Sequence, residues 1–135
     1  MTVSLDDCIA RLKQFGYEVS EDDKAVVQFE LTKMIAYTIN LCNLHSVEQL
    51  PNVLAPRVVD RVCSEFLFYK KNTGQLTDFD YSLATKSIEQ GDTKVTYAVG
   101  QEGDTNESRF DKAVEYMQRG YDKWVCKYRV IRWSM

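Results

Sequence analysis

One stretch of this 135-residue chain, residues 84–100, departs from the pattern of the rest and constrains the fold most. Across residues 94–99 apolar and polar side chains alternate, which is the period of a half-buried β-strand. Residues 90–92 are typical of a turn, and residues 87–89 can form a short first strand. The pattern predicts a β-hairpin over residues 84–99. Because an isolated two-stranded hairpin is marginally stable in water, we expect it to pack on helices or to pair its free edge with another chain.

Outside this stretch, apolar residues recur at the three- and four-residue spacing of helices. Helices are predicted at about residues 5–15, 21–43, 55–71 and 105–125. Residues 20–23 match a capping box, so the acidic cluster there is interpreted as the charged start of a helix and not as a metal site. Residues 126–135 form a C-terminal tail. The prediction is one mainly α domain over residues 1–135, a small bundle of about four helices with a β-hairpin between the third and fourth.

Composition is ordinary for a globular protein, with 44% hydrophobic and 27% charged residues. The first residues lack the pattern of a secretory signal, and no apolar run has the length of a membrane span. We therefore expect a protein that folds in a cytoplasm or in something assembled there. The four cysteines are widely spaced and form no C-x-x-C pair, which predicts reduced thiols.

Residues at catalytic or metal-binding spacing are few. The chain has neither a P-loop nor a dinucleotide-binding glycine motif. Cys42 and His45 make half of a zinc site without a second pair, and Asp78 and Asp80 are isolated loop carboxylates. The sequence predicts a non-enzyme without catalytic residues, metal or cofactor. A metal-dependent hydrolase built on these four residues is the last of three hypotheses.

The C-terminal end interleaves cations with aromatic residues. From Lys123 onward there are four basic residues and no acidic ones, whereas the preceding 122 residues hold 13 basic and 20 acidic residues, a net charge of −7. Such a segment suits a protein interface, where Trp, Tyr and Arg are favoured anchors, and it also suits nucleic acid. The acidic body disfavours DNA binding by the whole domain. The hypotheses therefore rank a protein interface first, packing against the bundle second and nucleic-acid binding third.

Five segments, residues 15–24, 62–67, 70–74, 86–96 and 128–133, also have a familiar order and spacing. Through them the chain resembles, over nearly its whole length, the head–tail connector (head-completion or adaptor) proteins of tailed bacteriophages and Gram-positive prophages. The resemblance implies a structural virion protein with no catalytic residues. Its subunits would form a ring beneath the capsid portal, closing or extending the DNA channel after packaging.

The resemblance also implies partners and a location. The partners would be further copies of the chain, the phage portal protein, a further connector or tail-completion protein, and passing DNA without sequence specificity, with no membrane involved. The location would be the head–tail interface of the virion, assembled in the bacterial host cytoplasm. The alternative from another class is a small DNA-binding or regulatory helical protein that uses the basic aromatic tail.

Two sets of interface residues follow from these expectations. Contacts between subunits are expected from the hairpin, at Lys86, Ile88, Asp92, Lys94, Val95, Tyr97 and Val99. Docking on the portal or on a neighbour is expected from the tail, at Trp124, Lys127, Tyr128, Arg129, Arg132 and Trp133.

Overall fold

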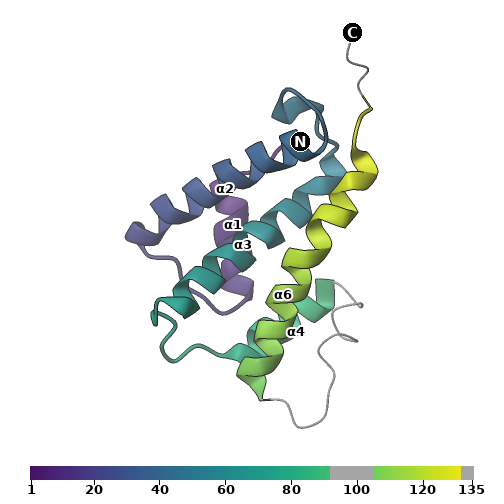
Figure 1. Cartoon of the computed structure of the whole chain (residues 1–135). Helices are drawn as coiled ribbons and strands as arrows, with labels where there is room; N and C mark the ends of the chain where they lie inside the picture. The colour runs from purple at the N-terminus through teal and green to yellow at the C-terminus, as the bar shows by residue number, and fades with distance from the viewer. Residues whose placement is uncertain (92–104, 132–135) are drawn as a thin grey trace.

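The computed structural model describes residues 1–91 and 105–131, without the side chains of residues 89–91. This part of the chain forms five α-helices, α1 (Leu5–Gln14), α2 (Glu21–Leu41), α3 (Ala55–Asn72), α4 (Tyr81–Gly91) and α6 (Asn106–Val125). Short 3-10 turns occur at Val47–Gln49, Asn52–Leu54 and Cys126–Tyr128 (Figure 1). The predicted mainly α fold is confirmed, and the four predicted helices correspond to α1, α2, α3 and α6.

Helix α3 lies at the centre of the arrangement, because α1, α2 and α6 all pack against it. Helix α4 packs against α6, on the side of the molecule opposite α2 (Figure 1). Within the described residues no helix is long and apolar enough to cross a bilayer.

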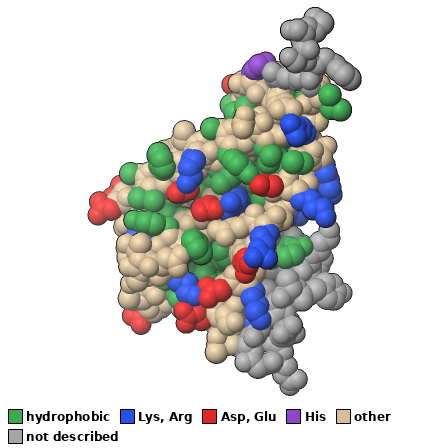
Figure 2. Space-filling model, in the orientation of Figure 1, with side chains coloured by type: hydrophobic (Ala, Val, Ile, Leu, Met, Phe, Trp, Pro, Cys, Tyr) green, Lys and Arg blue, Asp and Glu red, His purple; other side chains and the backbone are tan. Residues whose placement is uncertain are grey.

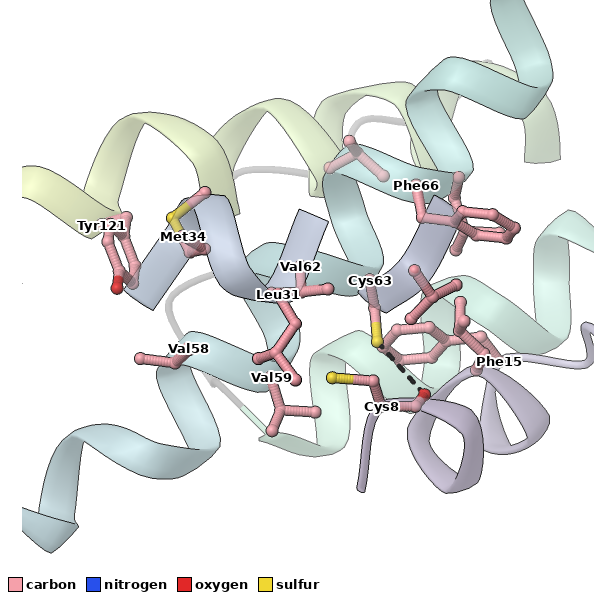
Figure 3. Close-up of a cluster of buried hydrophobic side chains, with 14 of the residues drawn as sticks. Cys8, Phe15, Leu31, Met34, Val58, Val59, Val62, Cys63, Phe66 and Tyr121 are labelled. Atoms are coloured by element: carbon pink, nitrogen blue, oxygen red, sulfur yellow. Dashed lines mark hydrogen bonds between the residues drawn. The ribbon is translucent and has the colours of Figure 1, made fainter. Parts of the chain in front are cut away.

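The core explains the central position of α3. Val58, Val62 and Phe66 follow one another at four-residue spacing along one face of α3, and each is fully buried. Around them lie side chains from α1, α2 and α6, among them Cys8, Leu31 and Tyr121 (Figure 3). Burying one Val or Phe side chain contributes about 1.5–3 kcal/mol, so this stripe fixes α3 against its neighbours.

Local signals set where α1 and α2 begin. The predicted capping box at residues 20–23 is confirmed: Ser20 Oγ accepts a hydrogen bond from Asp23 N (3.3 Å), and Asp23 Oδ2 accepts one from Ser20 N (3.2 Å). Ser4 and Asp7 form the same arrangement at the start of α1. Gly16 follows the end of α1 with a φ of +88°, a left-handed conformation that glycine adopts without strain.

The predicted β-hairpin is wrong in its first part. Residues 84–91 belong to α4, and no strand occurs in the described ranges 1–91 and 105–131; the remainder of the prediction, residues 92–99, lies outside them. Residues 84–91 form a helix and not a strand because Asp80 caps the start of α4, where it accepts a hydrogen bond from Leu83 N (3.1 Å). Ala84 and Ile88, one helical turn apart, are then both buried. Gly91 is the last residue of this helix and not part of a hairpin turn.

Candidate functional site

The C-terminal segment, defined here as residues 124–131, holds the predicted docking residues that the structure describes. It leaves α6 through the turn Cys126–Tyr128 and becomes extended at Arg129. Val130 N donates a hydrogen bond to Cys42 O (2.9 Å), and Asn43 Nδ2 donates one to Val130 O (3.1 Å). The segment is therefore anchored on the end of α2.

Aromatic packing holds the beginning of the C-terminal segment, and its cations face solvent. The rings of Trp124 and Tyr128 are half-buried and lie 5.5 Å apart between centroids. Lys127 and Arg129 are exposed, and Ile131 is 78% exposed. Four of the six predicted docking residues thus lie together on one segment. The other two, Arg132 and Trp133, are outside the described residues.

A cavity of about 230 Å³ lies beside this segment, between α3, α6 and the end of α4. We call it the basic pocket, because four cations line it: Arg57, Arg61, Lys123 and Lys127. Its apolar wall includes Ile88, Met117 and Trp124. In Figure 2 several basic side chains lie along the side of the molecule that α6 forms.

Interactions within the chain fix the two arginines of the basic pocket. The Arg57 guanidinium lies 4.9 Å from the centroid of the Trp124 ring, a cation–π distance. Arg61 forms an ion pair with Glu65 one turn along α3. Lys123 and Lys127, in contrast, are exposed and form no ion pair with any residue that the structure describes. Positive charge is thus concentrated at this place on an acidic protein.

Asp60, the one carboxylate among the described residues that line the basic pocket, already has a partner. Arg11 Nε donates to Asp60 Oδ1 at 2.7 Å, and Arg11 Nη2 donates to the carbonyl of Ser87 at 3.2 Å. The guanidinium of Arg11 therefore connects α1, α3 and α4. Asp60 forms its ion pair with this arginine of α1 and not with the lysines of the basic pocket.

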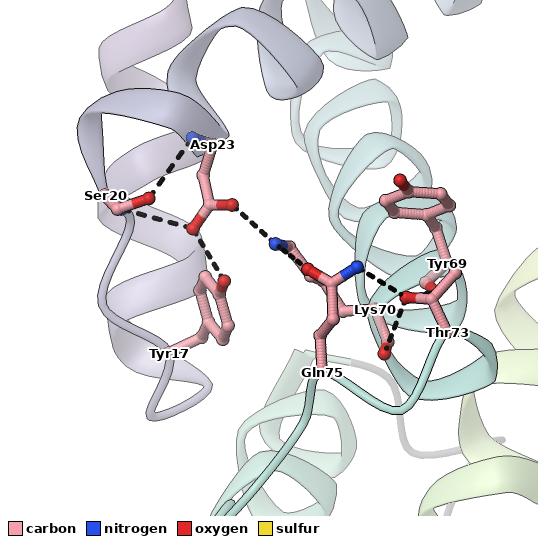
Figure 4. Close-up of polar contacts among 7 residues, drawn as sticks. All are labelled: Tyr17, Ser20, Asp23, Tyr69, Lys70, Thr73 and Gln75. Atoms are coloured by element: carbon pink, nitrogen blue, oxygen red, sulfur yellow. Dashed lines mark hydrogen bonds and ion pairs between the residues drawn. The ribbon is translucent and has the colours of Figure 1, made fainter.

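A second polar group, formed by Tyr17, Asp23 and Lys70, joins the start of α2 to the end of α3 (Figure 4). Lys70 Nζ lies 2.7 Å from Asp23 Oδ1, and Tyr17 Oη donates to Asp23 Oδ2 at 2.6 Å. Burial alone would raise the pKa of Asp23, but hydrogen bonds from Lys70, Tyr17 and Ser20 outweigh it and lower the pKa from its ordinary value of 3.8 to about 2. Asp23 and Lys70 are separated by α2 and α3 in the sequence, so no local pattern predicts their contact.

Of the seven residues predicted to contact other subunits, one is exposed, one is buried and five lie outside the described residues. Lys86 is exposed on α4. Ile88 is only 2% exposed and packs in the core of its own chain, so the expectation that it contacts a neighbouring subunit is corrected. The other five residues, Asp92, Lys94, Val95, Tyr97 and Val99, lie outside the described residues.

The possible zinc ligands do not converge. Cys42 is buried and its thiol points to the carbonyl of Val125, at 3.9 Å, whereas His45 is exposed. Among residues 1–91 and 105–131 no group of three or more His, Cys, Asp or Glu side chains is placed to hold a metal ion. All four cysteines are free thiols; burial, with a smaller effect of Asp7, raises the pKa of Cys8 to about 12.

Comparisons of the chain with protein-family models, with curated proteins and with solved structures find no match.

Proposed function

We propose that this protein is a structural subunit of a head–tail connector, which assembles with copies of itself into a ring and docks on a capsid portal. The observation that carries the proposal is the anchored C-terminal segment, which turns cations and apolar side chains outward. The order and spacing of the five segments that resemble connector proteins support it.

The chemistry of the C-terminal segment supports a protein contact. Arg129 is exposed and forms no ion pair with a described residue, and next to it Val130 and Ile131 are 43% and 78% exposed. A guanidinium beside apolar surface is typical of the central part of protein interfaces. Since hydrogen bonds to the end of α2 already order the backbone here, docking would order fewer groups and would retain more of the contact energy.

The acidic body supports a position around a DNA channel. Up to residue 122 the chain has a net charge of −7, and a negative channel lining repels DNA and lets it pass without adhering. In this arrangement the C-terminal segment contacts the portal, and the acidic body contributes to the channel. The proposed role is mechanical, with no catalytic step.

The experiment that tests the proposal combines size measurement with docking. Light scattering over a range of protein concentrations is expected to show an oligomer whose size rises with concentration. Adding duplex DNA should not change that size, because the oligomer does not bind DNA. Binding to purified portal particles should be lost in Arg129→Glu and retained in Lys13→Glu, which reverses an exposed charge on α1. A protein that neither oligomerises nor binds portal particles contradicts the proposal.

A second candidate, a small DNA-binding regulator, is favoured by one observation. Lys123, Lys127 and Arg129 place three exposed cations without ion pairs to described residues within seven positions, as a phosphate-binding surface requires. For this candidate the same light-scattering experiment should give a monomer that shifts onto duplex DNA, with an affinity that falls steeply as salt rises.

A further inference from the structure

We infer that the basic pocket receives an acidic surface at the start of α2 from a second copy of this chain, so that copies associate head to tail. The inference rests on the proposed function and names the contact through which the ring would form. The acidic surface, called the acidic turn, consists of Glu18, Glu21 and Asp22.

The shape of the basic pocket favours a compact acidic ligand over nucleic acid. Its four cations converge on a cavity of about 230 Å³, which has room for a few side chains. A nucleic-acid strand is an extended polyanion and is held by cations that follow its backbone along a groove. The half-buried side chains of Met117 and Trp124 in the wall of the cavity suit the methylene groups of a glutamate next to its carboxylate.

The charges of the two lysines in the basic pocket are not balanced by carboxylates among the described residues. Asp60 is paired with Arg11, and Lys123 and Lys127 have no carboxylate partner among the described residues. A carboxylate that entered the cavity would meet both lysines, next to Arg57, which lies over the Trp124 ring, and Arg61, which is paired with Glu65. Several charges that converge on one partner stabilise a contact more than one isolated surface pair does.

The acidic turn carries an excess of negative charge that complements the lysines of the basic pocket. Glu18 and Asp22 are exposed and form no ion pair with a described residue; Glu21 pairs with Lys24, but its side chain is 88% exposed, so that pair contributes little. The fourth acid of this region, Asp23, is buried against Lys70 and is not available. Because the capping box and Lys70 fix the backbone here, the acidic turn would dock without prior ordering.

The positions of the two surfaces decide the symmetry of the contact. Helix α2 begins at the left end of the molecule in Figure 1, whereas Cys126–Tyr128 lies at the upper right. In Figure 2 acidic side chains lie at that left end and basic ones at the α6 side. Since the acidic turn cannot reach the basic pocket of its own chain, the contact must join two copies. A contact between two different surfaces is heterologous, and it closes into a ring when the rotation between copies allows.

Charge reversal tests the inference. Sedimentation velocity in about 50 mM salt compares the wild type with Lys123→Glu/Lys127→Glu and with Glu18→Lys/Asp22→Lys. We expect each double variant alone to associate at least about tenfold more weakly than the wild type, because its two surfaces now carry like charges. An equimolar mixture of the two variants should regain association, since each basic surface again meets an acidic one. Far-UV circular dichroism checks that both variants are folded.

The control reverses two exposed lysines outside the basic pocket and outside the predicted interfaces, Lys13→Glu/Lys33→Glu, and should leave association within about twofold of the wild type. Association that is undiminished in Lys123→Glu/Lys127→Glu overturns the pocket contact and leaves the ring intact. A mixture that does not regain association, or a wild type that stays monomeric up to about 1 mM, also overturns the contact. The proposed function is then decided separately, by docking on portal particles.

Discussion

Replacing Asp23 by asparagine should destabilise the fold by about 2–3 kcal/mol at pH 7. The pKa of Asp23 falls from 3.8 to about 2, and each unit corresponds to about 1.4 kcal/mol in favour of the charged form. Breaking a fully buried ion pair costs about 3–5 kcal/mol, because the remaining charge stays desolvated. Here Lys70 keeps a hydrogen bond to Gln75 Oε1 (2.7 Å) and is 12% exposed, so we expect the smaller value.

Urea unfolding, followed by far-UV circular dichroism, measures this difference. The folded-state pKa is the lowered one, so the contribution of Asp23 is fully present above about pH 5 and is lost as the pH falls through the ordinary value of 3.8 toward about 2. The gap between wild type and Asp23→Asn should therefore be constant from pH 7 to about pH 5 and should shrink from pH 4 to pH 3.

The matched control is Asp22→Asn, which changes the neighbouring residue in the same helical turn. Asp22 is exposed and forms no ion pair with a described residue, so its replacement should change the free energy of unfolding by no more than about 0.5 kcal/mol. If Asp23→Asn and Asp22→Asn unfold at the same urea concentration, Asp23 is not the link between α2 and α3 described above. If the difference in free energy of unfolding between the wild type and Asp23→Asn stays constant down to pH 3, the ionised carboxylate of Asp23 is not what stabilises the fold.

Three further experiments, two by substitution and one by chemical modification, probe other parts of the fold. Ile88→Ala should lower the free energy of unfolding in urea by about 2–4 kcal/mol, and Leu83→Ala, at a residue that is 45% exposed, by less than about 1 kcal/mol; equal losses would contradict the burial of Ile88. Under native conditions a thiol reagent should modify Cys126 at once and the other three cysteines only as the protein unfolds, because those three are buried; rapid reaction of two or more thiols would contradict this. Tyr121→Phe should lower the free energy of unfolding by about 1–2 kcal/mol, because its buried hydroxyl group is hydrogen-bonded to Thr38; a neutral result would show that this bond contributes nothing.

Sequence patterns predicted the helices that carry strong local signals. The starts of α1 and α2 have capping boxes, and the buried stripe of α3 repeats every four residues over several turns. Residues 84–91 of α4 were assigned to the first part of a hairpin because the inward side of this helix has few apolar residues, and a short apolar pattern fits either period. The position of Asp80 before Leu83 is the sequence signal that could have identified its start.

The candidate site depends on contacts between distant segments, which no local pattern contains. Arg57 and Arg61 are four residues apart, as are Lys123 and Lys127, so each pair is visible in the sequence as one face of a helix. That the two pairs line the same cavity follows only from the packing of α6 on α3. For the same reason the sequence does not predict the ion pair between Lys70 and Asp23.

The hydrogen bonds at Val130 make the end of α2 and the C-terminal segment a thermodynamically linked pair. A partner that pulls the segment away must break the bonds to Cys42 and Asn43, at about 1 kcal/mol each. Pulling the segment away would also leave the Cys42 carbonyl at the end of α2 without its hydrogen-bond donor. A protein that binds the segment in this way would therefore loosen the last turn of α2. Conversely, whatever stiffens that turn holds the segment in place, 87 positions further along the chain. Deleting the segment would therefore remove the proposed binding surface and a helix cap together, and only single-residue changes can separate the two effects.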